Sequence, residues 1–190
     1  MAGHILREAL SRWITKRTST QILFYQSFIT SSVRLFYVLH MLFYFSGTGN
    51  SKWIATQLSF RLQEKLYFIP DLLRKQTFDF ILNNDERIGF VFPVYSWSLP
   101  DIVSSFIKKL SLQNYRCQYC FFVCSCGDDI GLTKNIFIKM MASKGWRCHA
   151  GFSVIMPNNY VLLPGFDVDD KSLAQKKLVN AIGKLDKIVA

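Results

Sequence analysis

From Met41 onward, short apolar runs alternate with stretches in which apolar residues recur at helical spacing. This alternation is typical of a parallel sheet covered by helices, because each pair of parallel strands needs a crossover between them. In the helix expected before Lys144-Gly145, the helical spacing of three apolar residues predicts that they form a buried stripe on one face. We expect one doubly wound α/β domain over residues 41–190, with five parallel strands in the order 2-1-3-4-5. The predicted strands are Met41–Phe45, Leu66–Ile69, Ile88–Phe92, Tyr119–Cys124 and Phe152–Met156, and the predicted stripe is Leu132, Ile136 and Met140.

A glycine-bearing loop lies between the first predicted strand and the first predicted helix. It reads Ser46-Gly47-Thr48-Gly49-Asn50-Ser51. The two glycines allow the backbone to curl so that successive N–H groups point inward, and the helix N-terminus adds partial positive charge. The three hydroxyl groups supply further hydrogen-bond donors. A triphosphate loop would need a Gly-Lys-[Ser/Thr] ending, and a dinucleotide loop would need a third glycine where Lys52 stands, so this loop predicts a phosphate monoester site.

Three blocks of sequence, in order, resemble the flavodoxin family, and most closely the flavodoxin module of bacterial flavodoxin and ferredoxin fusion proteins. The first block is Phe43 to Ser51, with a loop of the form [Ser/Thr]-x-Thr-Gly-x-[Ser/Thr]. The second is Phe90 to Pro100 and the third is Gly151 to Tyr160, so the resemblance covers most of residues 41–190. It implies a flavodoxin-like three-layer sandwich that binds flavin mononucleotide (FMN) through the loop and relays one or two electrons.

The same resemblance implies two loops beside the flavin ring. After the third strand come Pro93, Val94, Tyr95, Ser96 and Trp97, and the two aromatic side chains are expected to pack against the ring. The alternative is that both belong to the core, since the chain is rich in aromatic residues. After the fourth strand, Cys126, Gly127 and Asp128 are expected to border the ring and to offer backbone donors. Many flavodoxins have an aromatic residue in this second loop, and this chain has none.

The chain carries a net charge of +10 and has a pI near 9.5, which would suit nucleic acid or an anionic membrane if the charge were clustered. The lysines fall mostly on the polar faces of predicted helices, so we expect a solvated surface and no nucleic-acid partner. The five cysteines have no secretory disulfide spacing, which favours the cytoplasm. Cys117-x-x-Cys120 lacks the further ligands of a metal site, and Cys120, Cys124 and Cys126 are expected to act as small apolar residues.

Residues 1–40 differ in pattern from the rest of the chain, and three interpretations compete. The apolar stretch Ile22 to Phe45 is long enough to cross a membrane, but Gln26, Arg34 and several hydroxyl residues interrupt it, and its end overlaps a strand that the fold needs. The basic, acid-poor character would suit a targeting peptide. We favour a nonnative extension translated from an upstream start, with Met41 as the true first residue. No stable membrane insertion is expected.

The function expected from these features is that of an FMN-binding electron carrier. One alternative is an FMN-dependent NAD(P)H:quinone or azo reductase, although no second nucleotide motif is visible. A second alternative is an interaction domain without flavin, which the intact loop disfavours. The fusion proteins continue with a module that binds two iron-sulfur clusters, and no such cysteine run stands before Ala190. We therefore expect either a truncated fusion protein or a domain whose redox partner, such as a ferredoxin-type iron-sulfur protein, is a separate chain.

Overall fold

The computed structural model describes residues 41–159 and 167–190, so the expectations for residues 1–40 lie outside the described residues. No helix within these ranges is long and apolar enough to span a bilayer. In chain order, the elements are β1 (Met41–Tyr44), α3 (Asn50–Leu62), β2 (Lys65–Phe68), α4 (Ile69–Arg74), β3 (Asp79–Ile81), β4 (Ile88–Pro93), α5 (Asp101–Lys109), β5 (Ser111–Gln113), β6 (Cys120–Cys126), α6 (Thr133–Ser143), β7 (Ala150–Ile155) and α7 (Lys171–Val189).

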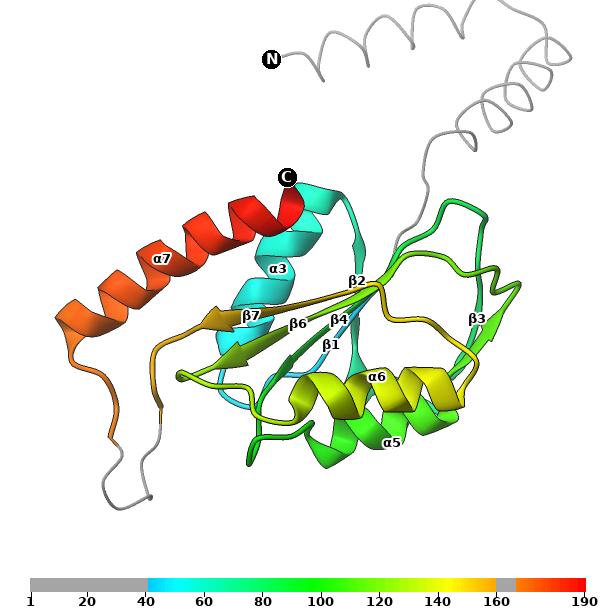
Figure 1. Cartoon of the computed structure of the whole chain (residues 1–190), viewed down its shortest axis with the longest axis horizontal. Coiled ribbons are helices and arrows are strands. Elements are labelled where there is room, and N and C mark those ends of the chain that lie inside the picture. The colour runs from blue at the N-terminus through cyan, green and yellow to red at the C-terminus, as the bar shows by residue number, and fades with distance from the viewer. Residues whose placement is uncertain (1–40, 160–166) are drawn as a thin grey trace, which may run out of the picture. The chain divides into compact units, whose positions relative to one another are not determined.

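Five of the strands form one sheet in the order β2-β1-β4-β6-β7, and every neighbouring pair is parallel. This is the predicted order 2-1-3-4-5, renumbered because two short strands lie elsewhere. The sheet begins in its middle with β1, and the chain moves outward to β2, then crosses back to β4 and continues to the other edge (Figure 1). The order therefore reverses between β1 and β4, and in such sheets the crevice beyond the carboxyl ends of these two strands receives ligands.

Helices cover both faces of the sheet, α5 and α6 on one and α3 and α7 on the other (Figure 1). Successive residues of a strand point to opposite faces, so Leu42 packs with α3 whereas Phe43 packs with α5. The α5 and α6 side is strongly aromatic: Phe137 of α6 lies within 5.7 Å of the rings of Phe92 and Phe122, measured between centroids. Burying each such ring stabilises the fold by roughly 1.5–3 kcal/mol.

A second, two-stranded parallel sheet joins β3 to β5 and was not predicted from the sequence. Each of these strands has three residues and buries only its central side chain, Phe80 or Leu112. A strand with one buried residue is too short to show a repeated alternation of apolar and polar side chains. Hydrophobic periodicity therefore could not reveal these two strands.

The helix after β6 buries a different stripe from the predicted one. Leu132 is 62% exposed and precedes the helix, whereas Thr133, Phe137 and Met141 are fully buried. Ile136 and Met140 pack only partly against the core. Apolar residues occupy adjacent positions along α6, so spacing alone allowed either stripe. The bulk of the aromatic ring at 137, packed between the phenylalanines of β4 and β6, decides the rotation.

Candidate cofactor-binding site

The loop from Ser46 to Ser51 connects β1 to α3 and leaves the start of that helix open. Gly49 is the N-cap residue and has φ 110°, a conformation that side chains other than glycine rarely adopt. Its N–H donates to Ser46 Oγ at 3.0 Å, which closes the loop on itself. No side chain caps α3, and among the described residues no acceptor bonds the N–H groups of Asn50 and Ser51. These groups are free to bind an anion.

The side chains of the loop tie it to the rest of the site. Ser51 Oγ lies 2.7 Å from Ser125 Oγ at the end of β6, and both hydroxyl groups are buried. Asn50 Nδ2 donates to the carbonyl oxygen of Pro157, 2.9 Å away, in the segment after β7. Thr48 Oγ1 accepts a hydrogen bond from the Asn159 side chain. The start of α3 is thereby joined to the carboxyl ends of β6 and β7.

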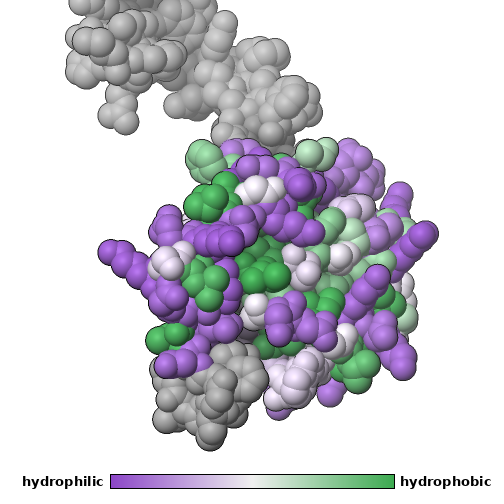
Figure 2. Space-filling view, turned by 60° about the vertical axis from the view of Figure 1, so that its left-hand side comes forward, coloured by the Kyte–Doolittle hydropathy of each residue, from purple (hydrophilic) through white to green (hydrophobic). Residues whose placement is uncertain are grey.

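A cavity lies inside these contacts at the carboxyl end of the sheet, with an open volume of about 550 Å³ that includes some solvent. Figure 2, turned to bring this end of the sheet forward, shows apolar surface bordered by hydrophilic residues. The lining comes from four segments: Ser46, Gly47, Thr48, Asn50 and Ser51; Pro93, Val94 and Tyr95; Ser125, Cys126 and Gly127; and Met156, Pro157 and Asn159.

The segment after β4 forms a tight hairpin at the mouth of the cavity. Tyr95 and Ser98 exchange both backbone hydrogen bonds, and the two residues between them have positive φ, 49° at Ser96 and 56° at Trp97. This is the geometry of a type I′ turn, here built without glycine. Non-glycine residues with such φ values cluster at functional sites, where the surroundings hold them in place.

The two aromatic residues of the hairpin occupy different positions. Tyr95 lines the cavity and is 46% exposed, and a Cβ atom added at Gly47 would lie 2.5 Å from its hydroxyl oxygen. A side chain at Gly47 would therefore require the Tyr95 ring to move away from the loop. Trp97 is 67% exposed, packs against Gly131 and lies outside the lining, at the rim. Neither ring is part of the core.

The end of β6 forms an uncharged part of the cavity wall. Cys126 is almost fully buried, and burial, helped by the nearby carboxylates of Asp128 and Asp129, raises the pKa of its thiol to about 11. The thiol is therefore protonated at neutral pH. A Cβ atom added at Gly127 would lie 2.7 Å from the Asn158 side chain, so a larger residue here would require that side chain to shift. The Asp128 carboxylate accepts from the N–H of the next residue and stays outside the lining.

A charged pair holds the segment after β7 in place. Asp169 accepts a hydrogen bond from the Asn158 N–H at 3.0 Å and pairs with Lys177 of α7 at 2.6 Å. The Lys177 ammonium group, together with that N–H, holds the pKa of Asp169 below its ordinary value. The wall formed by Pro157 and Asn159 is therefore fixed to α7.

The structure brings ten of the fourteen predicted site residues to the cavity lining. The other four, Gly49, Ser96, Trp97 and Asp128, lie in the same loops but not on the lining. Sequence reasoning did not include Met156, Pro157 and Asn159 among the site residues, although they fall in the third block that resembles flavodoxins. Ser125 begins the loop that was expected to border the ring but was not among the predicted site residues.

The residues present suit a phosphate monoester attached to a flat ring. Free N–H groups and hydroxyl groups of the Ser46–Ser51 loop lie at one side of the cavity, where the helix N-terminus favours an anion. Pro93, Val94, Tyr95 and Met156 supply apolar and aromatic surface. The lining contains no lysine, arginine, aspartate or glutamate among the described residues, so the anion would be held by dipoles alone.

Comparisons with known proteins identify the family of the chain. Among solved structures, the chain is similar to the two-electron reduced flavodoxin of Megasphaera elsdenii (18% identity, 64% of this chain and 90% of that one, TM-score 0.47). It is also similar to a flavoprotein in complex with FMN from Lactobacillus acidophilus (14%, 62% and 93%, TM-score 0.45) and to an azoreductase of Bacillus anthracis (10%, 80% and 98%, TM-score 0.49). No curated protein matches the chain. The sequence profile of the flavodoxin domain matches residues 41–158, more than half of the chain, and the chain therefore belongs to the flavodoxin domain family.

Proposed function

We propose that this chain binds FMN in the cavity at the start of α3 and serves as an electron carrier. The observation that carries the proposal is the uncapped N-terminus of α3, whose N–H groups and neighbouring hydroxyl groups face a cavity without charged side chains. A helix N-terminus of this kind favours a phosphate group. Membership in the flavodoxin domain family supports a flavin as the attached ring system. The ring of a bound flavin takes up and releases electrons.

The lining supports a carrier better than an enzyme that moves protons. No carboxylate, imidazole or amine lines the cavity among the described residues, and the Cys126 thiol has a raised pKa of about 11. A general acid or base needs a pKa near the working pH. The residues therefore bind, orient and exclude water, and none of them is suited to transfer a proton at neutral pH.

The proposed partner is a separate redox protein, such as a ferredoxin-type iron-sulfur protein. Tyr95 and Trp97 are the exposed rings at the mouth of the cavity, so a partner that docks there would come close to the flavin ring. Interfaces between two electron-transfer proteins are usually small, which suits a transient complex.

The experiment is a binding titration of purified full-length protein with FMN, riboflavin and FAD, followed by flavin fluorescence. We expect FMN to bind at least a hundredfold more tightly than riboflavin, because riboflavin lacks the phosphate. FAD should bind weakly, because its second phosphate and nucleoside have no place in a monoester loop. Equal affinities for FMN and riboflavin would refute the phosphate site, and the absence of any flavin binding would leave only the role of an interaction domain.

A second measurement separates the carrier from a reductase. The FMN-loaded protein is mixed with NADH or NADPH and a quinone or an azo dye, and nucleotide oxidation is followed. We expect no turnover above the background of free FMN, together with fast electron transfer to an added iron-sulfur or haem protein after chemical reduction. Rapid steady-state oxidation of the nucleotide would identify a reductase instead.

A further inference from the structure

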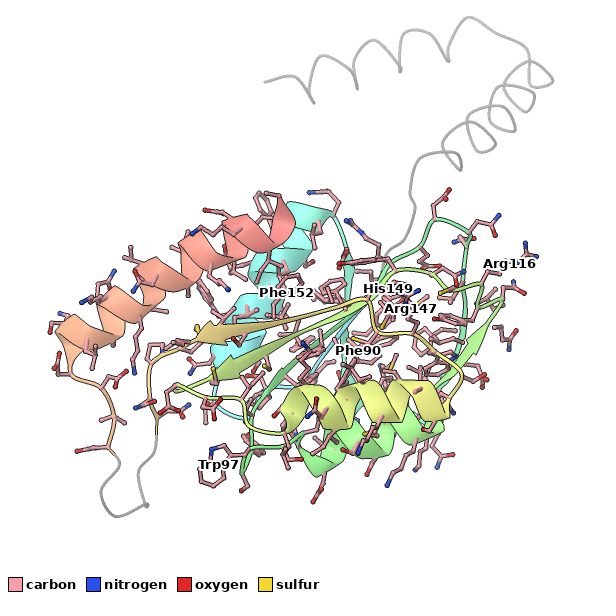
Figure 3. The ribbon with its side chains drawn as sticks, in the orientation of Figure 1. Phe90, Trp97, Arg116, Arg147, His149 and Phe152 are labelled. Carbon is pink, nitrogen blue, oxygen red and sulfur yellow. The ribbon has the colours of Figure 1, made fainter. Side chains whose placement is uncertain are left out.

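A cluster of reactive side chains lies at the end of the sheet opposite the cavity, where β6 and β7 begin. Figure 3 shows Arg147 and His149 at this end and Trp97 at the other. Cys117 is exposed, and its Sγ atom lies 3.8 Å from Nε2 of His149. The proposed flavin site does not use this cluster.

Hydrogen bonding fixes which nitrogen of His149 carries the proton. The Cys120 N–H donates to Nδ1 at 3.1 Å, so the neutral ring bears its proton on Nε2, the atom that faces Cys117. The ring cannot easily turn away, because the His149 N–H donates to the Cys120 carbonyl oxygen at 2.7 Å and the ring stacks on Tyr119 with centroids 5.3 Å apart. An N–H donor is therefore held against the sulfur that must bear negative charge when it attacks another atom.

Tyr115 lies against the same thiol. Its hydroxyl oxygen accepts a hydrogen bond from the Arg147 N–H at 2.8 Å, which leaves its own proton for another acceptor. Burial raises the pKa of Tyr115, and interaction with Cys117 raises it further, while the Arg147 N–H acts in the opposite direction. The Tyr115 hydroxyl group is therefore close enough to Cys117 for the two groups to influence each other.

The other four thiols are poorly placed to react. All five cysteines fall within the described residues, and of these only Cys117 is exposed. Burial strongly raises the pKa of Cys120, and it raises the pKa of Cys124 to about 12. Cys148 is partly buried, and its thiol donates to the Ala150 carbonyl oxygen at 3.4 Å. Thiolate chemistry is therefore expected at Cys117 and not at its neighbours.

The two segments that form the cluster carry a net positive charge. Arg116 and Arg147 are exposed and lie on the two segments that carry Cys117 and His149. Residues 111–119 and 144–149 contain three basic residues and no aspartate or glutamate. A small anionic reactant would be attracted to this surface, and a cationic one would be repelled.

We propose that Cys117 is a thiol modification site, at which an anionic disulfide of low molecular mass forms a mixed disulfide while His149 positions and stabilises the attacking sulfur. The Cys117 sulfur attacks one sulfur of the small disulfide, so that a new S–S bond forms as the old one breaks. The departing thiolate takes a proton from solvent, which has received the proton of the Cys117 thiol. The small disulfide is the oxidant, and one half of it leaves as a thiol.

The first test uses oxidised glutathione, an anionic disulfide, with the full-length protein. Intact mass and peptide mapping should show one glutathionyl group per chain, located on Cys117. Cys117→Ser should abolish the adduct, and the matched variant Cys148→Ser should leave its yield unchanged. An adduct at Cys148, or adducts spread over several cysteines, would overturn the proposal.

The second test separates the role of His149 from simple exposure of the thiol. His149→Asn keeps an acceptor near the Cys120 N–H but removes the donor to Cys117, whereas His149→Gln can still reach Cys117 with an amide N–H. We expect the rate of adduct formation to fall at least fivefold in the Asn variant and to recover in large part in the Gln variant. Thermal unfolding checks that both variants are folded. Equal rates in the parent and in a folded Asn variant would overturn the positioning role.

The third test concerns charge. The reaction rate with oxidised glutathione is divided by the rate with cystamine, a cationic disulfide, at low ionic strength. The ratio should exceed one in the parent and fall several-fold when Arg116→Gln and Arg147→Gln are combined. Lys139→Gln, an exposed change on α6, is the control and should not alter the ratio. A ratio at or below one in the parent would overturn the preference for anions.

Discussion

The hydroxyl groups of Ser51 and Ser125 lie 2.7 Å apart in the buried wall of the cavity and join the first turn of α3 to the end of β6. Only one of the two hydroxyl protons is donated in the hydrogen bond between the two oxygens. The other is free to donate into the cavity, so the pair acts as one donor unit with a fixed direction.

We therefore expect Ser51→Ala and Ser125→Ala each to weaken FMN binding by about 1.5–3 kcal/mol, the cost of one hydrogen bond to a charged group. The double variant should lose much less than the sum, because both changes remove the same donor unit. Titration calorimetry measures all four proteins. Riboflavin affinity should hardly change, and Ser143→Ala, an exposed serine at the end of α6, is the control. Additive losses would show that the two hydroxyl groups act separately.

Gly49 offers a matched test of the phosphate loop. Gly49 and Gly145 both have positive φ, 110° and 76°, and neither has an atom within 4 Å of an added Cβ atom. Gly49→Ala and Gly145→Ala should thus both strain the backbone and lower the free energy of unfolding by about 1 kcal/mol. Only Gly49→Ala should weaken FMN, because only this residue shapes the loop. Chemical denaturation and a binding titration distinguish the two effects, and an equal loss of affinity in both variants would contradict the loop assignment.

Tyr95 and Trp97 should differ in their effect on a bound flavin. Tyr95 lines the cavity, whereas Trp97 lies at its rim. Tyr95→Ala should cost about 1–3 kcal/mol of affinity, relieve much of the quenching of flavin fluorescence and raise the midpoint potential, because water would then stabilise negative charge on the ring. Trp97→Ala should have smaller effects on all three. Spectroelectrochemical titration measures the potential, and larger effects from Trp97→Ala would place the indole over the ring.

Stability should depend on pH through Glu64, a fully buried carboxyl group 3.4 Å from the Arg87 guanidinium. Burial raises the pKa of Glu64 to about 7, and the Arg87 charge offsets only part of this rise. The unfolded chain releases the proton near pH 4.5, so between about pH 4.5 and 7 the folded state binds more protons and its stability falls as pH rises. The loss approaches about 3 kcal/mol above pH 7.

Glu64→Gln removes this titration and should flatten the pH dependence of the free energy of unfolding between pH 5 and 8. Urea denaturation at several pH values measures the slope. Asp85→Asn, a change at an exposed carboxylate in the nearby loop, is the control and should retain the slope of the parent. If Glu64→Gln and the parent had the same slope, the buried carboxyl group would not be its source.

The features that were predictable from the sequence are those encoded in contiguous residues. The apolar run of β1 followed by Ser46–Ser51 indicated both the central strand and the loop that leads into α3, because strand, turn and helix signals follow one another directly there. The predicted order of the parallel strands was also confirmed. It could be predicted because five buried strands with helical crossovers allow few arrangements. Cys120, Cys124 and Cys126 are buried, as expected.

The rest depended on how distant segments meet. Asn159 and Pro157 reach the loop at Thr48 and Asn50 only because β7 lies at a particular register beside β6, and no local pattern specifies that register. Ser96 and Trp97 have positive φ although neither is a glycine, the residue that usually marks such a turn. The turn therefore could not be recognised from the residue types. The exposed thiol of Cys117 also resembles its buried neighbours in sequence. Only the positions of β6 and β7 bring His149 to it.

The hydrogen bond from Asn50 to the Pro157 carbonyl oxygen has a consequence for the order of events in the cell. The Ser46–Ser51 loop is synthesised early, but one wall of its cavity is the segment from Met156 to Asn159, more than a hundred residues later. A nascent chain therefore lacks the complete cavity until β7 has left the ribosome and joined the sheet. We therefore expect flavin loading to follow translation of nearly the whole domain, and a chain on a ribosome stalled before that point to retain no flavin.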